Sequence, residues 1–277
     1  RGQRAVTIVA IAGDATTTTA VAIAAGWPTG RDDDVVVVEA DPYGGSLAGW
    51  LDTPAQPSLA TIVANAGVDA GRDPRTVLDT VDAMTRRSES GVRFIPNAVR
   101  ARAAHRAVEE AGLIVVPALA GAPTVVLADV GRLRAVDTPS PAIRAADVVV
   151  IVHRQAAASA PAATVRVERL VESVEELAHL DVAFVLAVVG RSPFDPAEIG
   201  QFVDQAVPDT IRHTVALSDD PLAAATLAGR SGVSAKRLRR LPLMRDAARL
   251  AGDLADLLAS DRALRTAPHF ESEDAST

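Results

Sequence analysis

Apolar residues in this chain gather in short runs separated by longer stretches of helical pattern. Several runs are rich in β-branched residues and are apolar at consecutive positions rather than at alternating ones. A strand buried on both faces has this pattern, as in a parallel sheet covered by helices. The predicted strands are Val6–Ala12, Val35–Ala40, Val92–Ile95, Leu113–Val116, Thr124–Ala128, Asp147–Val152 and Val182–Val189, with Arg212–Leu217 as a candidate final strand.

The intervening stretches are predicted helices, and a proline after Asp195 is typical of a capped helix start. They are Thr18–Gly26, Leu59–Ala66, Pro74–Arg86, Ala101–Ala111, Ala160–His179, Pro196–Ala206, Leu222–Ala228 and an amphipathic segment from about Leu243 to Leu258. This alternation predicts the α/β class, as a three-layer, doubly wound, mainly parallel sheet with helices on both faces. We expect one domain over residues 1–265 and a disordered acidic tail over residues 266–277.

Composition narrows the classes of function. Apolar residues make up 48% of the 277 positions, which is enough for a substantial core. Aromatic residues are only 3%, which argues against a stacking platform for single-stranded nucleic acid. The net charge of −7 argues against a surface that binds polyanions everywhere. The absence of cysteine excludes disulfides, thiol catalysis and cysteine-ligated zinc.

No part of the sequence predicts a membrane span or a histidine metal site. The longest uncharged run, Ala111 to Ala128, is interrupted by Pro117, Gly121 and Pro123, so it is predicted to form strands and turns. No signal peptide is visible, so we expect a cytoplasmic protein. The five histidines show no ligand spacing. His153 follows a strand and can reach a site there, and the alternative, which we favour, is a core or surface role.

The loop after the first strand is the strongest candidate for a binding site. It reads Ile11-Ala12-Gly13-Asp14-Ala15 and leads into four threonines, Thr16–Thr19, that open a helix. Free N–H groups and the helix dipole at such a position favour a phosphate. We therefore expect Gly13, Asp14, Ala15, Thr16, Thr17 and Thr18 to contact a nucleotide. The alternative is a helix start capped by hydroxyls with no ligand.

Two further strand ends carry acidic residues. The second strand ends in Glu39-Ala40-Asp41, and a later one ends at Asp129. In an open α/β sheet the ligand lies at the carboxyl ends of the strands. With Thr17 these aspartates are candidate Mg²⁺ ligands, and Asp41 is the candidate catalytic residue. The alternative is that each aspartate caps a turn.

The order of these pieces resembles the MinD/ParA family of P-loop ATPases. VTIVAIAGDATTTTAVAIA is similar to the family's deviant Walker A segment, and VVVVEADPYGGSLAGWL to its second strand and following glycines. TVVLADVGR, ending in Asp129, resembles a Walker B strand. The resemblance covers roughly Val6 to Leu258 and implies ATP and Mg²⁺ as ligands, a homodimer, and protein partners within a larger machine.

The chain departs from the family pattern at the residues that hold phosphate. The resemblance places Thr16 at the phosphate-binding lysine and Ile11 at the signature lysine, while Ala12 and Ala15 fall on glycines. Glu39 replaces the first aspartate of the acidic pair, and Gly190-Arg191 stands where relatives carry an adenine-reading asparagine. We therefore expect a degenerate member, with ATP hydrolysis weak or absent, that regulates or scaffolds a partitioning, division, pilus or secretion machine. The alternative is an active ATP-dependent dimerisation switch.

One dense basic segment gives a third alternative. SAKRLRRLPLMR contains Lys236, Arg237, Arg239 and Arg240 and can hold DNA non-specifically or an acidic partner. A solvated helix face is the plainer reading of the same residues. We expect a partner, the membrane or the nucleoid to localise the protein, without a transmembrane segment of its own.

Overall fold

The chain forms one eight-stranded sheet in strand order β3-β4-β2-β5-β1-β6-β7-β8. The computed structural model describes residues 7–29, 34–69, 74–119, 124–133, 139–156 and 159–266. All paired strands are parallel except β3 and β4, which are antiparallel. The strands are β1 (Thr7–Gly13), β2 (Asp34–Glu39), β3 (Arg86–Arg87), β4 (Arg93–Ile95), β5 (Thr124–Gly131), β6 (Val148–Arg154), β7 (Ala183–Val189) and β8 (Ile211–Leu217).

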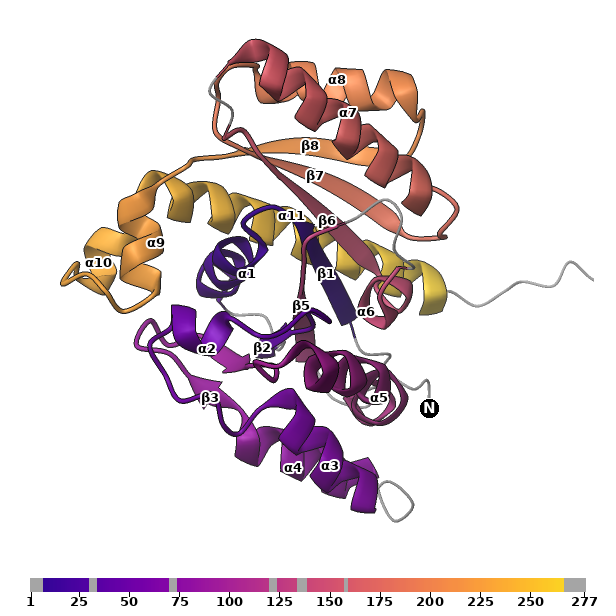
Figure 1. Cartoon of the computed structure of the whole chain (residues 1–277), viewed down its shortest axis with the longest axis vertical. Coiled ribbons are helices and arrows are strands. Elements are labelled where there is room, and N and C mark those ends of the chain that lie inside the picture. Colours follow the sequence, from indigo (N-terminus) through magenta and orange to yellow (C-terminus); the bar gives the residue numbers. More distant parts are fainter. Residues whose placement is uncertain are drawn as a thin grey trace, which may run out of the picture.

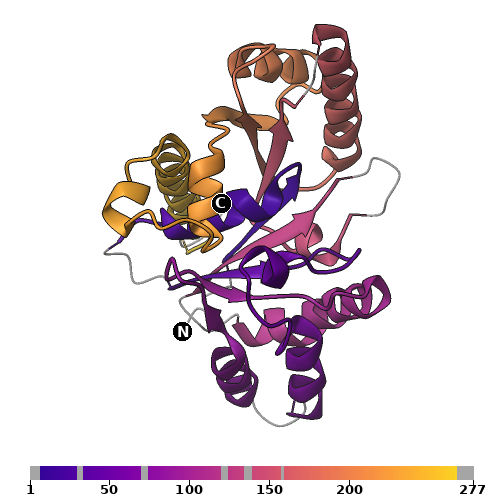
Figure 2. The same ribbon diagram turned by 60° about the vertical axis from the view of Figure 1, so that its left-hand side comes forward.

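Helices cover both faces of this sheet, and α7 and α8 lie at the opposite end of the molecule from α3 and α4 (Figures 1 and 2). The helices are α1 (Thr16–Ala25), α2 (Leu47–Trp50), α3 (Leu59–Asp69), α4 (Pro74–Met84), α5 (Ala101–Leu119), α6 (Pro141–Arg144), α7 (Ala160–Leu177), α8 (Pro196–Ala206), α9 (Pro221–Leu227), α10 (Ala235–Leu238) and α11 (Pro242–Thr266). The three-layer α/β prediction is confirmed.

Two apolar clusters, one on each face, fix the layers. Residues of α1, α9 and α11 pack on one face around Val9 and Ile11, and residues of α3, α5, α7 and α8 pack on the other around Ile8 and Ile151. Consecutive strand residues therefore enter opposite cores, which is why the strands are apolar without alternation. As predicted, Asp195 caps α8, in a capping box with Glu198 and with Pro196 as the first helical residue.

The predicted strand at Leu113–Val116 is wrong, because these residues belong to α5. Ala104, Ala107, Val108, Ala111 and Val115 recur at helical spacing and are buried, which continues the apolar face of the helix past its predicted end. Leu113 lies on the other side of that face and is 80% exposed. Helix packing therefore overrides the β-branched character of this run.

The remaining differences are small. Sequence patterns did not indicate the short elements α2, β3, α6 and α10. Helix α11 continues to Thr266, and the rest of the tail that we expected to be disordered lies outside the described residues. In the described part of the chain, no helix is both long enough and apolar enough to cross a membrane.

Candidate functional site

The loop between β1 and α1 lies at the carboxyl edge of the sheet, where β1 sits between β5 and β6. Gly13 has φ +118°, and a Cβ there would lie 2.2 Å from the carbonyl oxygen of Val152, so only glycine fits. The Asp14 N–H donates to the same oxygen at 2.8 Å. Ala15 adopts the left-handed conformation with φ 51° and ψ 30° just before α1 begins. The last residue of the loop thus has a backbone conformation that favours glycine, but alanine occupies this position.

The hydroxyls at the start of α1 are turned toward protein groups. Thr17 Oγ1 donates to Asp129 Oδ2 at 2.6 Å, and the Thr16 hydroxyl also hydrogen-bonds Asp129. Thr19 Oγ1 donates to the carbonyl oxygen of Ala15 at 3.0 Å. The residue at the N-cap is Ala15, without a side-chain cap, so the hydroxyls of this run do not cap the start of α1.

Asp129 is the central acidic group of the site and is 1% exposed. It is level with Glu39 on β2 and with Ile11 on β1. Burial raises the pKa of Asp129 and the nearby Asp41 raises it further, while hydrogen bonds from the two threonine hydroxyls and the Gly131 N–H lower it. A carboxylate and a threonine hydroxyl are both oxygen ligands of the kind that Mg²⁺ prefers.

Asp41 lies beside Asp129 and Thr17, as expected for an acidic residue at the carboxyl end of a neighbouring parallel strand. A Cβ on Gly131, which has φ +75°, would lie 2.3 Å from Asp41 Oδ2, so the carboxylate rests against the backbone at the end of β5. Asp41 Oδ1 accepts from the Tyr43 N–H at 2.8 Å. The structure therefore brings Thr17, Asp41 and Asp129 together at one point, with Asp41 also closing a local turn.

Glu39 has a structural role that the sequence did not indicate. It is 1% exposed and accepts three backbone N–H groups, from Ser46 at 2.5 Å, Leu47 at 2.7 Å and Asn97 at 2.8 Å. Burial raises the pKa of Glu39, and these hydrogen bonds oppose the rise. Glu39 thereby joins the segment after β2 to the segment after β4.

Arginines near the loop were also missed by the sequence reasoning. Arg166 Nη2 on α7 donates to Asp14 Oδ2 at 2.6 Å and to the carbonyl oxygen of Arg154 at 3.1 Å. Arg154 in turn forms a forked ion pair with Asp219, with contacts of 2.9 to 3.2 Å. His153 is buried on this side, and its pKa is lowered mainly by burial. Asp14 is thus held by a hydrogen bond from α7 and by one from the Arg154 N–H at the end of β6.

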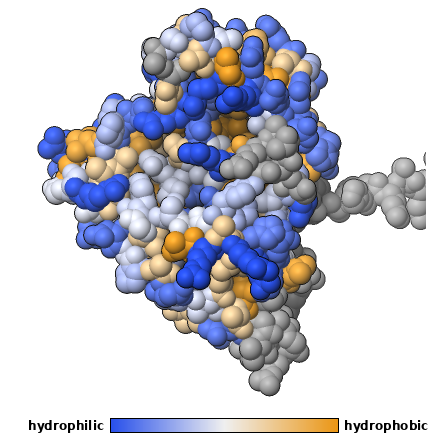
Figure 3. Space-filling model, viewed as in Figure 1, coloured by the Kyte–Doolittle hydropathy of each residue, from blue (hydrophilic) through white to orange (hydrophobic). Residues whose placement is uncertain are grey.

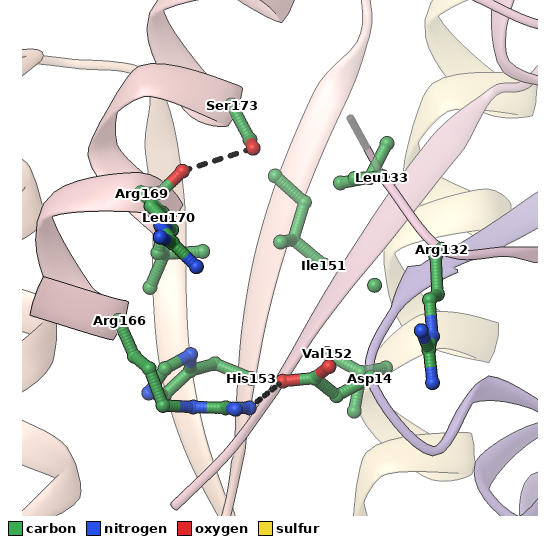
Figure 4. Close-up of a pocket in the computed structure, with 11 residues that line it drawn as sticks. Asp14, Arg132, Leu133, Ile151, Val152, His153, Arg166, Arg169, Leu170 and Ser173 are labelled. Carbon is green, nitrogen blue, oxygen red and sulfur yellow. Dashed lines mark hydrogen bonds and ion pairs between the residues drawn. The ribbon is translucent and has the colours of Figure 1, made fainter. Parts of the chain in front are cut away.

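Two cavities flank the loop. One, of about 330 Å³, lies beside α1 and is lined by residues that include Ala15, Thr18, Arg154, Asp219, Pro221 and Arg230. The other, of about 220 Å³, lies on the α7 side (Figure 4). Among the described residues no group of three or more histidine, aspartate and glutamate side chains is arranged to hold a metal by itself. Thr17, Asp41 and Asp129 fit a Mg²⁺ that a nucleotide would also ligate.

No family model and no curated protein matches the sequence, but solved structures match its fold. A ParA family ATPase from Chlorobium tepidum aligns with 90% of this chain and 98% of its own, at TM-score 0.64 and 16% identity. The chain has the fold of the ParA and MinD ATPases. MinD from Pyrococcus horikoshii with Mg-ADP aligns with 92% of this chain and 98% of its own, at TM-score 0.56 and 17% identity. The MinC:MinD complex from Aquifex aeolicus aligns with 90% of this chain and 96% of its own, at TM-score 0.57 and 14% identity.

Within the ParA/MinD fold, the two positions that the resemblance assigns to lysine hold no charge here. Thr16 is 5% exposed and is bonded to Asp129, and Ile11 is fully buried in the apolar cluster under α1. The predicted site for DNA or an acidic partner lies elsewhere in the molecule. It consists of four exposed residues, here named the α10 basic cluster: Lys236, Arg237, Arg239 and Arg240. They lie on and beside α10, far from α7 (Figure 1).

Proposed function

We propose that this chain is a ParA/MinD-like spatial regulator or scaffold for a larger partitioning, division, pilus or secretion machine, with weak or absent ATP hydrolysis. It acts in the cytoplasm as a homodimer, and a partner recruits it to the membrane or nucleoid. The ParA/MinD fold supports a positioning role. A similar MinD has been solved in complex with MinC, a cell division protein, which supports a protein partner.

The observation that supports this proposal most is the environment of Thr16, which the resemblance places at the position of the phosphate-binding lysine. Thr16 is buried, and its hydroxyl is hydrogen-bonded to Asp129. A charge-assisted hydrogen bond contributes roughly 1.5–3 kcal/mol, so the lost lysine weakens phosphate binding about ten- to a hundredfold. The loss of the second lysine, at Ile11, removes charge that would act in the transition state.

The second candidate is an active ATP-dependent dimerisation switch. It is supported by the grouping of Thr17, Asp41 and Asp129 and by the cavity of about 330 Å³ beside α1. In this candidate Gly13, Asp14, Ala15, Thr16, Thr17 and Thr18 hold the phosphates, and Mg²⁺ lies near the two aspartates. Asp41 then contributes to the hydrolytic site.

Thermal unfolding with ATP·Mg²⁺, with ADP·Mg²⁺ and without ligand separates the two candidates. A ligand at about 100 times its Kd adds about 2.7 kcal/mol, which raises Tm by several degrees. The scaffold predicts no shift at millimolar nucleotide. The switch predicts a shift for ATP that is lost in Asp41→Ala and kept in Asp204→Ala, a matched change at an exposed aspartate of α8.

A restored loop tests whether the missing groups are the cause. The double variant Ala15→Gly with Thr16→Lys returns the glycine and the phosphate-binding lysine to their family positions. We expect it to acquire an ATP-dependent rise in Tm that the parent lacks. A restored variant that folds normally and still ignores ATP would count against the degenerate loop as the reason for weak binding.

A third candidate, non-specific DNA binding, is favoured by the exposure of the α10 basic cluster. Phosphate contacts by these side chains would release counterions, so retention on DNA should fall steeply with salt. Replacing the four residues by alanine should abolish that retention. The same retention after replacement would remove the α10 basic cluster from consideration.

A further inference from the structure

The cavity on the α7 side of the loop lies on the sheet face opposite α1. Its apolar wall comes from Ile151, Leu170 and Leu133, and its charged rim includes Arg132, Arg166 and Arg169 (Figure 4). We name it the arginine cavity after these three side chains. In Figure 3 a hollow below the upper end of the molecule has apolar surface at its bottom and hydrophilic surface around it.

Charge is unbalanced in this cavity. Three arginines face a single carboxylate, Asp14, among the lining residues, which leaves a formal excess of two positive charges. His153 also lines the cavity, and because burial lowers its pKa it is neutral near pH 7. The chain as a whole carries −7. A concentration of positive charge on a negative protein raises the local concentration of anions.

The three arginines differ in exposure and in how many of their hydrogen-bond donors are already used. Arg166 is fixed by its hydrogen bonds to Asp14 and to the Arg154 carbonyl, yet its buried Nε has no hydrogen-bond partner. Arg132 and Arg169 are exposed, and in the part of the chain that the structure describes neither forms an ion pair. Hydrogen-bond donors of two guanidinium groups therefore remain available beside a third that is already oriented.

We propose that the arginine cavity binds the phosphate group of a small anion, on the other side of the loop from the cavity beside α1. Guanidinium groups match the oxygens of an oxyanion in a forked, two-bond geometry, which favours phosphate over halide. The excess of two positive charges favours a multiply charged phosphate over a single carboxylate. The volume of about 220 Å³ accommodates one or two phosphate groups with a few waters at about 30 Å³ each. This inference does not depend on the proposed function, because it requires neither ATP binding nor hydrolysis.

Binding of inorganic pyrophosphate, measured by titration calorimetry at low salt, tests the proposal. Arg169→Gln and Arg132→Gln should each weaken binding about ten- to a hundredfold, since each removes a charge-assisted contact. Arg102→Gln, at an exposed arginine of α5 outside both cavities that flank the loop, is the matched control and should leave the Kd unchanged. Both test residues are exposed, so their replacement should preserve the fold, which circular dichroism checks.

Thr18→Asp separates this cavity from the site beside α1. Thr18 lines only the larger of the two cavities flanking the loop, and a carboxylate there repels phosphate at the start of α1 while suiting the helix dipole. Pyrophosphate binding that survives Thr18→Asp and is lost in the arginine variants supports the proposal. Binding lost in Thr18→Asp, binding indifferent to the arginine variants, or no binding by the parent protein overturns it.

A parallel titration with ADP identifies the source of the phosphate. If ADP shows the same dependence on Arg132 and Arg169 as pyrophosphate, the cavity accepts the phosphate end of a nucleotide. If ADP responds only to Thr18→Asp while pyrophosphate responds to the arginines, the cavity takes free phosphate anions. Both results support a phosphate site in the arginine cavity.

Discussion

Replacing Ala15 by glycine should stabilise the protein, because Ala15 has a left-handed backbone at φ 51°. For a residue with a Cβ, that conformation costs about 1–2 kcal/mol of conformational energy. Glycine avoids this cost but loses about 0.4–1 kcal/mol through the greater freedom of the unfolded chain. The net expectation is a gain of about 0.5–1 kcal/mol in the free energy of unfolding, or about 2 °C in Tm for a chain of this size.

Urea denaturation of Ala15→Gly measures this gain, and Ala64→Gly provides the control. Ala64 is exposed within α3, where the same substitution should cost about 1 kcal/mol. The two variants differ only in the backbone conformation that receives the glycine, so the reasoning predicts opposite signs. Equal destabilisation by both would refute the claim that Ala15 is strained.

Three other predictions concern the site and its surroundings. Burial raises the pKa of Asp129 and of Glu39, so the folded protein binds more protons than the unfolded chain. These two groups therefore contribute stability at low pH that is lost as pH rises above their ordinary pKa values of 3.8 and 4.5. Asp129→Asn should flatten that decline, measured by urea denaturation at increasing pH from the ordinary pKa of an aspartate upward, and an unchanged slope would contradict it. Gly131→Ala should destabilise by about 1–3 kcal/mol, because its Cβ meets the carboxyl group of Asp41 at positive φ. Adding Asp41→Ala should recover part of that loss in a double-mutant cycle, whereas strict additivity would show that the clash is not the cause. Glu39→Gln should cost about 1–3 kcal/mol, since an amide cannot accept all three backbone N–H groups, and a neutral result would show that the segments after β2 and β4 hold without it.

Much of the fold follows from local pattern. β-branched runs with apolar residues at consecutive positions gave β1, β5, β6 and β7 to within a few residues, because both faces of these strands are buried. The same rule failed at Leu113–Val116, where the buried face of α5 decides the structure. The two-residue strand β3 and the four-residue helices α2, α6 and α10 carry too few positions for any periodicity to emerge.

The candidate site was partly predictable, for a topological reason. Parallel strands end at the same edge of the sheet, so acidic residues at the ends of β2 and β5 had to approach the loop after β1, and Thr17 does reach Asp129. The contact between Arg166 and Asp14 joins residues 152 positions apart and depends on how α7 packs. The role of Glu39 depends on where three backbone N–H groups converge, which no sequence pattern records.

The two outer strands of the sheet also limit how the protein can assemble. β3 has only two residues, both arginine, and β8 carries the exposed Arg212 near its start. Short edges and charged edge side chains oppose the pairing of strands between molecules. Growth of the sheet into fibres is thereby discouraged at both borders, so self-association would proceed through helices or through the loops at the carboxyl edge.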